Sequence, residues 1–322
     1  GLSTRYEYDP MGRVTAVQHS DGSNESYAYR PDGELMEAAN QHIAIKFERD
    51  PLGRVLREIQ GGFVVDSVYD KLGMRTEVRS SLGAHLTFGR NLMGDVEKVS
   101  ANGAGKPWEA TFKRDSLGLE TERMLPGGVR SRWERDKLGR PIRQEMFAGG
   151  GKPTRSRTYT WDVNDRLKQI TDDQKGIVKF EHDAFGNLAS AQYGDDSFEF
   201  RMPDAVGNLF RSKDQKDRKY GPAGQLLEAN GTRYDYDPEG NLIKKTEPNG
   251  ATWYYEWNAA GMLRRVVRPD GDAVAFTYDA LGRRISKQYR GKTTRWVWDG
   301  NNILHEWIET APPRPEDTLR PA

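Results

Sequence analysis

The chain has 322 residues with 49 basic and 48 acidic side chains, and its net charge of +1 does not favour a nucleic-acid or anionic-membrane partner. It contains no cysteine, which excludes disulfides, thiolate catalysis and cysteine-ligated metals. Charged residues make up 30% of the chain, yet 8 Trp, 14 Tyr and 11 Phe are more aromatic residues than disordered chains carry. No apolar run reaches the roughly 18 residues that span a bilayer, and no signal peptide is visible at the start.

A short motif recurs along the chain: Asp-x-x-Gly, then Arg or Asn, then an aliphatic residue, with a period of about 21 residues. Weaker copies fill the gaps, with Arg30 or Asn91 in place of the Asp and Asp165 in place of the Gly, which makes about fifteen units. The longer steps fall at Gly/Pro-rich inserts, 102–107 and 149–153, which are typical of lengthened loops. The predicted structural repeat positions are Tyr8, Asp9, Gly12, Asp50, Gly53, Tyr69, Asp70, Gly73, Asp115, Gly118, Asp136, Gly139, Asp183, Gly186, Asp204, Gly207, Tyr236, Asp237, Gly240, Tyr278, Asp279 and Gly282.

Each unit predicts two strands and two turns. Aromatic pairs two residues apart precede the motif, as at Tyr27 and Tyr29, and share one face of a half-buried strand. The Asp accepts backbone N–H bonds in the turn, and the Gly takes the left-handed conformation. This combination predicts a type I turn followed by a bulge. The returning strand then reaches a second polar turn, such as residues 20–23.

The array as a whole predicts an all-β fold. One hairpin is marginal alone, but stacked units give a long antiparallel sheet with one aromatic face and one polar face. Such a sheet must curve because strand twist accumulates. No convincing amphipathic helix exceeds two turns, and the stretch at 305–308 is compatible with a strand.

These repeats resemble the YD repeat of RHS proteins, from Tyr6 to about Ile308. The core that carries the resemblance reads Tyr-Asp-x-x-Gly-Arg/Asn-Leu. The resemblance implies a spiral antiparallel β-sheet of hairpin repeats that forms part or all of a hollow shell or barrel, over residues 1–310. It also implies a structural, non-enzymatic role: a cocoon segment of a bacterial Rhs toxin that encapsulates a C-terminal toxic domain until delivery.

The implied partners are the enclosed toxin domain of the same parent protein, a secretion spike protein and an immunity protein. The implied location is secretion or delivery from a bacterium, by the type VI apparatus for example, or display at the cell surface. The family's Asp-Pro-x-Gly-Leu cleavage motif is missing, since Asp50-Pro51-Leu52-Gly53 lies in register with the repeats as a turn. Residues 311–322 form a predicted Pro-rich extended tail that leads to an absent C-terminal region.

Residues suited to chemistry do not cluster in the sequence. The five histidines (19, 42, 85, 182 and 305) lie far apart, without His-Glu-x-x-His spacing. Gly105-Lys106 and Gly151-Lys152 echo a phosphate loop, but each is followed by Pro. The acidic pairs Asp172-Asp173 and Asp195-Asp196 are interpreted as solvated turns. We therefore predict no catalytic, cofactor-binding or metal-binding residue, and no cofactor.

Two alternatives remain open from the sequence. The first is a cell-surface adhesion or carbohydrate-binding scaffold, since exposed aromatic platforms can stack on sugars. Aromatic pairs occur in nearly every unit, however, which favours a structural role. The second is a β-propeller enzyme, since two units match the length of a blade of about 40–50 residues. The single-hairpin identity of each unit and the lack of catalytic clusters weigh against it.

Overall fold

The structure is a computed structural model that describes residues 3–102 and 107–310. The predicted tail at 311–322 and the pair Gly105-Lys106 lie outside these described residues. The chain forms two compact units. Unit 1 comprises residues 1–68, 78–84 and 231–322, and unit 2 comprises residues 69–77 and 85–230.

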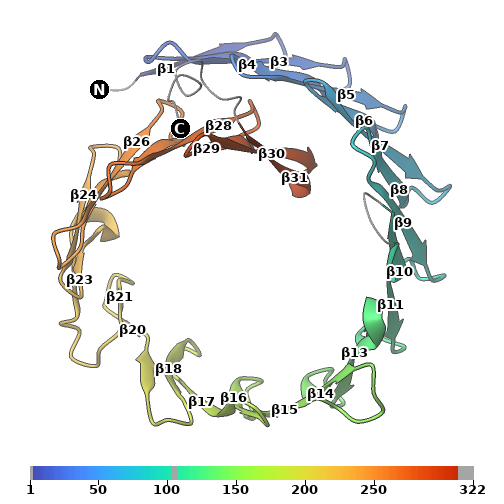
Figure 1. Cartoon of the computed structure of the whole chain (residues 1–322), viewed down its shortest axis with the longest axis vertical. Helices are drawn as coiled ribbons and strands as arrows, with labels where there is room; N and C mark the ends of the chain where they lie inside the picture. Colours follow the sequence, from blue (N-terminus) through green and yellow to red (C-terminus); the bar gives the residue numbers. More distant parts are fainter. Residues whose placement is uncertain (1–2, 103–106, 311–322) are drawn as a thin grey trace, which may run out of the picture. The chain divides into compact units, whose positions relative to one another are not determined.

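Unit 1 contains the first and the last strands of the chain, which lie side by side in blue and in orange to red (Figure 1). Its strands are β1 (Thr4–Tyr8), β2 (Val14–His19), β3 (Asn24–Tyr29), β4 (Leu35–Asn40), β5 (Ala44–Arg49), β6 (Val55–Gln60), β7 (Phe63–Tyr69), β24 (Thr232–Tyr236), β25 (Leu242–Thr246), β26 (Thr252–Trp257), β27 (Leu263–Val267), β28 (Ala273–Tyr278), β29 (Arg284–Tyr289), β30 (Lys292–Asp299) and β31 (Asn302–Thr310). The residues of β8 (Arg75–Ser80) are divided between the two units, and the last residue of β7, Tyr69, belongs to unit 2.

Unit 2 contains the central strands and two single turns of 3-10 helix. Its elements are β9 (His85–Arg90), β10 (Val96–Asn102), β11 (Trp108–Arg114), β12 (Glu120–Leu125), η1 (Pro126–Gly128), β13 (Val129–Arg135), β14 (Pro141–Ala148), β15 (Arg155–Trp161), β16 (Leu167–Asp172), β17 (Gly176–His182), β18 (Leu188–Gln192), β19 (Phe198–Phe200), β20 (Met202–Pro203), β21 (Leu209–Phe210), β22 (Arg218–Tyr220), η2 (Pro222–Gly224) and β23 (Leu226–Ala229). The all-β prediction is confirmed. In the part of the chain that the structure describes, no helix is long and apolar enough to cross a membrane.

The strands form three sheets, β1–β19, β20–β21 and β22–β31, and within each sheet strands that follow each other in the sequence pair antiparallel. In β5 and β6, for example, Phe47 lies opposite Glu58, and the register shifts between Glu48 and Arg49, just before the Asp-x-x-Gly turn. The same shift precedes this turn in repeat after repeat, as between Glu7 and Tyr8 in β1. The extra residue of a bulge leaves the ladder and increases the local twist, so each repeat bends the sheet in the same way.

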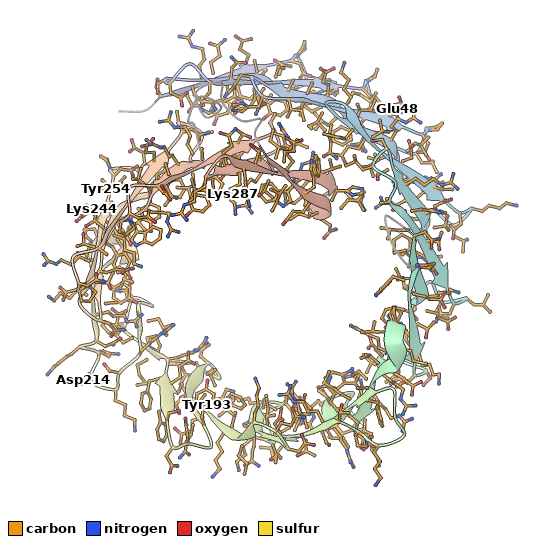
Figure 2. The ribbon with its side chains drawn as sticks, in the orientation of Figure 1. Glu48, Tyr193, Asp214, Lys244, Tyr254 and Lys287 are labelled. Carbon is orange, nitrogen blue, oxygen red and sulfur yellow. The ribbon has the colours of Figure 1, made fainter. Side chains whose placement is uncertain are left out.

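Alternate side chains leave the strands on opposite faces (Figure 2). On β5, Ile45 and Phe47 are buried, whereas Lys46 and Glu48 are exposed on the other face. Unit 1 is the better buried unit: it holds nine of the thirteen buried hydrophobic residues among those described. The core is therefore densest where the first and last repeats lie together.

The repeats are least regular near residues 198–220. The predicted hairpins are shortened here, because strands β19 to β22 contain only two or three residues each. At the η2 turn, Ala223 takes the left-handed conformation with φ 56°. The motif in this stretch has Gly221 where other copies have Asp, so the carboxylate that fixes the turn elsewhere is missing.

Candidate functional site

The Asp-x-x-Gly turn is the unit from which the larger contacts are built. In the first copy, the N–H of Gly12 donates to the carbonyl oxygen of Asp9 at 2.9 Å, and Gly12 has φ 79°. The Asp9 carboxylate accepts from the N–H groups of Met11 and Arg13. The corresponding bond from Gly to Asp forms at Asp50–Gly53, Asp70–Gly73, Asp115–Gly118, Asp136–Gly139, Asp183–Gly186, Asp204–Gly207, Asp237–Gly240 and Asp279–Gly282.

The predicted tyrosines Tyr8, Tyr69, Tyr236 and Tyr278 each end the strand that leads into such a turn. The structure thus spreads the predicted repeat positions along the array and does not gather them into one pocket. Their arrangement is a row of turns along one rim of each unit. Whatever site the chain has must come from contacts between repeats.

The Arg after the Gly connects one repeat to the next, a role that the sequence analysis missed. Arg13 donates through Nε to the Asp9 carboxylate at 2.6 Å and through Nη1 to the carbonyl oxygen of Arg30, in the next turn, at 2.9 Å. The backbone N–H and the guanidinium of Arg13 hold the pKa of Asp9 below its usual value. Where Asn replaces Arg, as at Asn187, the side chain still bonds to the Asp of its own turn. The recurrence of Arg or Asn directly after the Gly was the sequence signal that could have predicted this link between turns.

Within unit 1, the second turns of the first repeats contact the Asp-x-x-Gly turns of the last repeats. We call this contact the seam. Three side chains at or beside the ends of the early strands bond to backbone groups of residues that lie 238 positions later. These bonds are Asp21 Oδ2 with the Ala259 N–H at 3.0 Å, Asn40 Nδ2 with the Tyr278 carbonyl at 2.9 Å, and Gln60 Nε2 with the Trp298 carbonyl at 2.5 Å.

The polar side chains of the seam pair with backbone groups at or near the ends of late strands. Tyr278 is the last residue of β28 and lies opposite Arg284, and Trp298 is the second-last residue of β30 and lies opposite Ile303. Gln60 is 2% exposed and bonds to both backbone groups of Trp298, since its Oε1 also accepts from the Trp298 N–H at 2.9 Å. Buried backbone groups must be paired. The amides of Asn40 and Gln60 therefore complete the hydrogen bonding of the last repeats.

A buried ion cluster lies beside these bonds. Arg283 is 7% exposed, and its guanidinium contacts the carboxylates of Asp279 and Glu58 at 2.7 Å each. It also donates to the carbonyl oxygen of Gly300. Burial raises the pKa of Glu58, and the positive charge of Arg283 opposes that rise. A buried charge requires a partner, so this cluster ties β6 of the early repeats to the turn before β29.

A cavity of about 760 Å³ opens along the seam. The early repeats contribute Tyr6, His19 and Tyr27 to its wall, and the last repeats contribute Arg264 and Phe276. The Tyr27 hydroxyl donates to the carbonyl oxygen of Ala280 at 3.0 Å, and burial raises the pKa of Tyr27 to about 12. Polar and aromatic groups thus share this wall, which suits a ligand with both polar edges and an apolar face.

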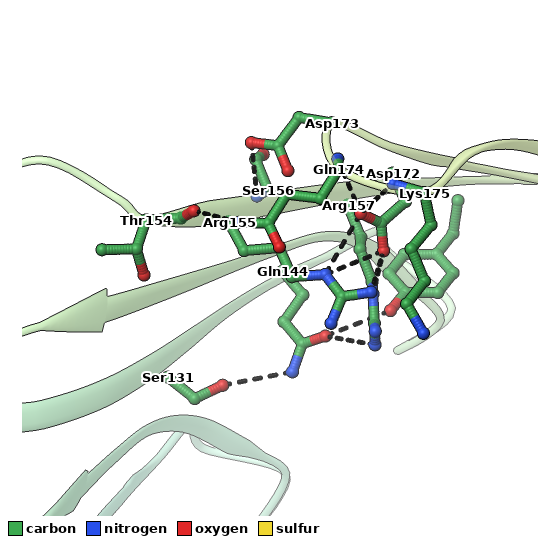
Figure 3. Close-up of polar contacts among 11 residues, drawn as sticks. Ser131, Gln144, Thr154, Arg155, Ser156, Arg157, Asp172, Asp173, Gln174 and Lys175 are labelled. Carbon is green, nitrogen blue, oxygen red and sulfur yellow. Dashed lines mark hydrogen bonds and ion pairs between the residues drawn. The ribbon is translucent and has the colours of Figure 1, made fainter.

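A second polar cluster, in unit 2, corrects one prediction. Asp172 is not a solvated turn residue: it is 7% exposed, and Arg155 and Arg157 both donate to its carboxylate (Figure 3). The Arg155 guanidinium, more than any other group, holds the pKa of Asp172 well below its usual range. A carboxylate held ionised in this way cannot serve as a general acid near neutral pH. Asp195, by contrast, is exposed and accepts from the Ser197 N–H.

The histidines do not converge. His19 contacts the Glu25 carboxylate at 2.9 Å, and His305 contacts the Ser80 hydroxyl at 2.6 Å in the seam. Burial lowers the pKa of His305. Across residues 3–102 and 107–310, no group of three or more His, Asp or Glu side chains could hold a metal ion.

The family model described as Teneurin YD-shell matches residues 130–299, more than half of the chain. The chain belongs to the YD-shell family. The predicted RHS/YD-repeat relationship is therefore confirmed, and the YD shell is a structural repeat fold. Similar YD-shell proteins include the double-stranded DNA deaminase toxin A of Burkholderia cenocepacia, 30% identical over 95% of this chain and 23% of that protein. Toxin protein Tse5 of Pseudomonas aeruginosa is 27% identical over 91% of this chain and 26% of its own length.

Solved structures agree on the fold. The crystal structure of TcdB2-TccC3-Cdc42 matches with a TM-score of 0.56 and 12% identity, over 98% of this chain and 22% of that chain. Mouse teneurin-4 is 24% identical over 48% of this YD-shell segment. The chain spans about a quarter of the length of its bacterial relatives or less.

Proposed function

We propose that this YD-shell segment is part of the wall of a cocoon that encloses a C-terminal toxic domain of its parent protein until delivery. The relatives that share it carry different activities in their names: one is a DNA deaminase toxin and another is a probable deoxyribonuclease of Dickeya dadantii. Since the shared segment covers 95% and 83% of this chain, the differing activities point to regions outside it. The segment itself is then a container and not an enzyme.

The seam is the observation that carries the proposal. A wall that holds a folded domain must keep its first and last repeats together. Gln60 and Asn40 do this with side-chain bonds to the backbone of late strands, and Arg283 adds a buried ion pair. Each of the three bonds joins residues that are 238 positions apart, so the early and the late repeats meet in one fixed register. Contacts in a fixed register keep the early repeats from sliding along the late repeats. A wall that contains a folded domain needs such fixed contacts.

The parent's delivery partners follow from the same proposal. A secretion spike protein, acting in a type VI route, would carry the loaded parent out of the cell, and an immunity protein would neutralise the toxin in the producing cell. Interbacterial competition would be the setting. The relatives named as toxins support this setting.

The test uses the longest natural product of the gene, purified natively. It is denatured, and the intact mass of every piece is measured. Containment predicts that a separately cleaved C-terminal fragment copurifies with the repeats and is released on denaturation. A single uncut chain with nothing enclosed would contradict it.

A glycan-binding scaffold is the second candidate, and the cavity favours it. Tyr6 is 51% exposed at this cavity, and Phe276 lies in the same wall. Aromatic faces beside amides and charged groups suit a sugar ring with its hydroxyls. Retention on a glycan array that is lost on Tyr6→Ala, with unchanged thermal stability, would support it. No retention of the folded chain would exclude it.

A further inference from the structure

In the part of the chain that the structure describes, the succession of paired strands is broken in one place, within unit 2. Strands β1 to β19 form one sheet and β22 to β31 form another, while β20 and β21 pair only with each other (Figure 1). β20 and β21 share two residue pairs, whereas β13 and β14 share seven. The repeats are also shortened here, since Gly224 lies 17 residues after Gly207 and Gly240 lies 16 residues after Gly224. The ladder of backbone hydrogen bonds is therefore weakest between β19 and β23.

Side chains bridge this break where the backbone ladder is missing. The Tyr220 hydroxyl donates to the carbonyl oxygen of Leu209, and the Gln215 amide donates to the carbonyl oxygen of Pro203 at 3.1 Å. Both bonds are exposed to solvent. An exposed side-chain bond is readily exchanged for a bond to water, so it contributes little net stability.

The same stretch has almost no core. From residue 192 to residue 230, Phe210 is the one residue that is buried in the structure. Tyr193, Phe198 and Leu209 are large apolar residues of this stretch, yet each is exposed. Burial of apolar surface is the main favourable contribution to folding. These repeats therefore gain less stability from packing than their neighbours.

Backbone strain is concentrated here as well. Six residues other than glycine have a left-handed backbone among those described, and four of them lie in this stretch: Asp196, Gln215, Ala223 and Asn230. In this conformation the Cβ approaches the following carbonyl oxygen, which destabilises the folded backbone. Ala223 has φ 56° and no polar side chain that could offset the cost with a local hydrogen bond.

Few ladder bonds, little burial and a strained backbone mark the part of a structure that opens at the lowest free energy. We propose that residues 198–230 are the place where this wall opens: β20 to β23 separate from their neighbours while the strands on both sides stay folded. The seam keeps the early and late repeats of unit 1 together during this opening, because its bonds and ion pairs lie outside the segment. The use of the opening rests on the proposed containment, since an enclosed chain would leave through the gap.

Trypsin reports the opening, because the segment contains five cleavage sites within nine residues and a protease needs a locally unfolded chain. The sites are Arg211, Lys213, Lys216, Arg218 and Lys219. Under native conditions, the first cut that divides the 322-residue chain into two large pieces should fall at one of these residues. A first cut in any other stretch would overturn the proposal.

Ala223→Gly should slow this cleavage about threefold, because glycine adopts the left-handed backbone without strain. Asp165→Gly is the matched control, since Asp165 also has a left-handed backbone, with φ 62°, but lies in a regular repeat. Cleavage at 211–219 should be unchanged in this control. If Ala223→Gly cleaved at the wild-type rate, opening of the segment would not limit the cut, and the proposal would fail.

A third variant separates local opening from global unfolding. Gln60→Ala removes a bond of the seam in unit 1 and should leave cleavage at 211–219 unchanged if the opening is local. Hydrogen exchange gives a second measurement: amides of β22 and β23 should exchange about a hundredfold faster than those of β29 and β30. Faster cleavage in Gln60→Ala, or equal exchange in the two pairs of strands, would overturn the proposal.

Release of the enclosed fragment from the longest natural product, measured by size exclusion in mild urea, tests the use of the opening. Ala223→Gly should slow release by the same factor as it slows trypsin cleavage. Unchanged release beside slower cleavage would overturn the role as an exit. Absence of any copurifying fragment would contradict containment and not the opening, which trypsin and hydrogen exchange decide by themselves.

Discussion

Gln60 shows how much one side chain contributes when it pairs with both backbone groups of a residue in a distant repeat. Its amide is almost fully buried and bonds to the carbonyl and the N–H of Trp298. Asp21 and Asn40 have the same role at the neighbouring turns. At this scale the seam depends on short polar side chains, each matched to one or two backbone atoms.

Gln60→Ala should lower the free energy of unfolding by about 1–3 kcal/mol, because two buried backbone groups lose their partners. Chemical denaturation measures the loss, and hydrogen exchange at the Trp298 amide should become faster. Gln192→Ala is the matched control, since Gln192 also ends a strand but bonds only weakly within its own turn, to Asp196 at 3.4 Å. Equal losses for the two variants would show that the seam bond contributes nothing.

Asp21 makes the seam sensitive to acid. The Ser23 hydroxyl and the Ala259 N–H lower the pKa of Asp21 to about 2. A carboxyl whose pKa is depressed in the folded state adds stability above its unfolded pKa and loses it as the pH falls through the folded value. This contribution should therefore be present above about pH 4 and disappear towards pH 2.

Asp21→Asn should cost stability at pH 5, by less than Gln60→Ala, and the cost should shrink between pH 4 and pH 2. Denaturation of the variant and the wild type over this range measures it. Asp195→Asn is the control, because Asp195 makes the same bonds to its own Ser197 but has no seam contact. If both variants gave the same pH dependence, the Ala259 bond would have no role.

At the scale of the element, the turn and its bulge define the repeat. The left-handed Gly, the capping Asp and the following Arg are all local in sequence, and the period of the motif therefore predicted the hairpins. Local reasoning failed where a residue's partner lies in another repeat. Asp172 was predicted to be a solvated turn residue, but Arg155 and Arg157, on the paired strand β15, enclose it.

Gly12→Ala should destabilise the first repeat by about 1–2 kcal/mol, the cost of a left-handed backbone for a residue with a Cβ. Gly12 has φ 79°, and a Cβ added there would meet no atom within 4 Å. The loss of stability would therefore come from the backbone conformation and not from a steric clash. Gly62→Ala is the control: its Cβ would also meet nothing within 4 Å, and its φ is not left-handed. Thermal denaturation should separate the two variants. A Gly62→Ala loss as large as that of Gly12→Ala would contradict the turn assignment.

At the scale of the whole molecule, the family and the all-β fold were predictable because nearly every repeat carries the same turn motif and the same strand pattern. The seam was not. Nothing near Asn40 in the sequence indicates that its amide meets Tyr278, since that pairing depends on how many repeats separate the two. In retrospect, the polar residues at or beside the early strand ends (Asp21, Asn40, Gln60 and Ser80) were the available signal. Only a structure could supply their partners.

Containment is the central claim, and protease protection of the region downstream of residue 310 tests it most directly. The longest natural product is digested under native conditions beside the same downstream region expressed alone. The account predicts that the region survives inside the intact product and is digested when alone. Digestion at the same rate in both samples would contradict containment.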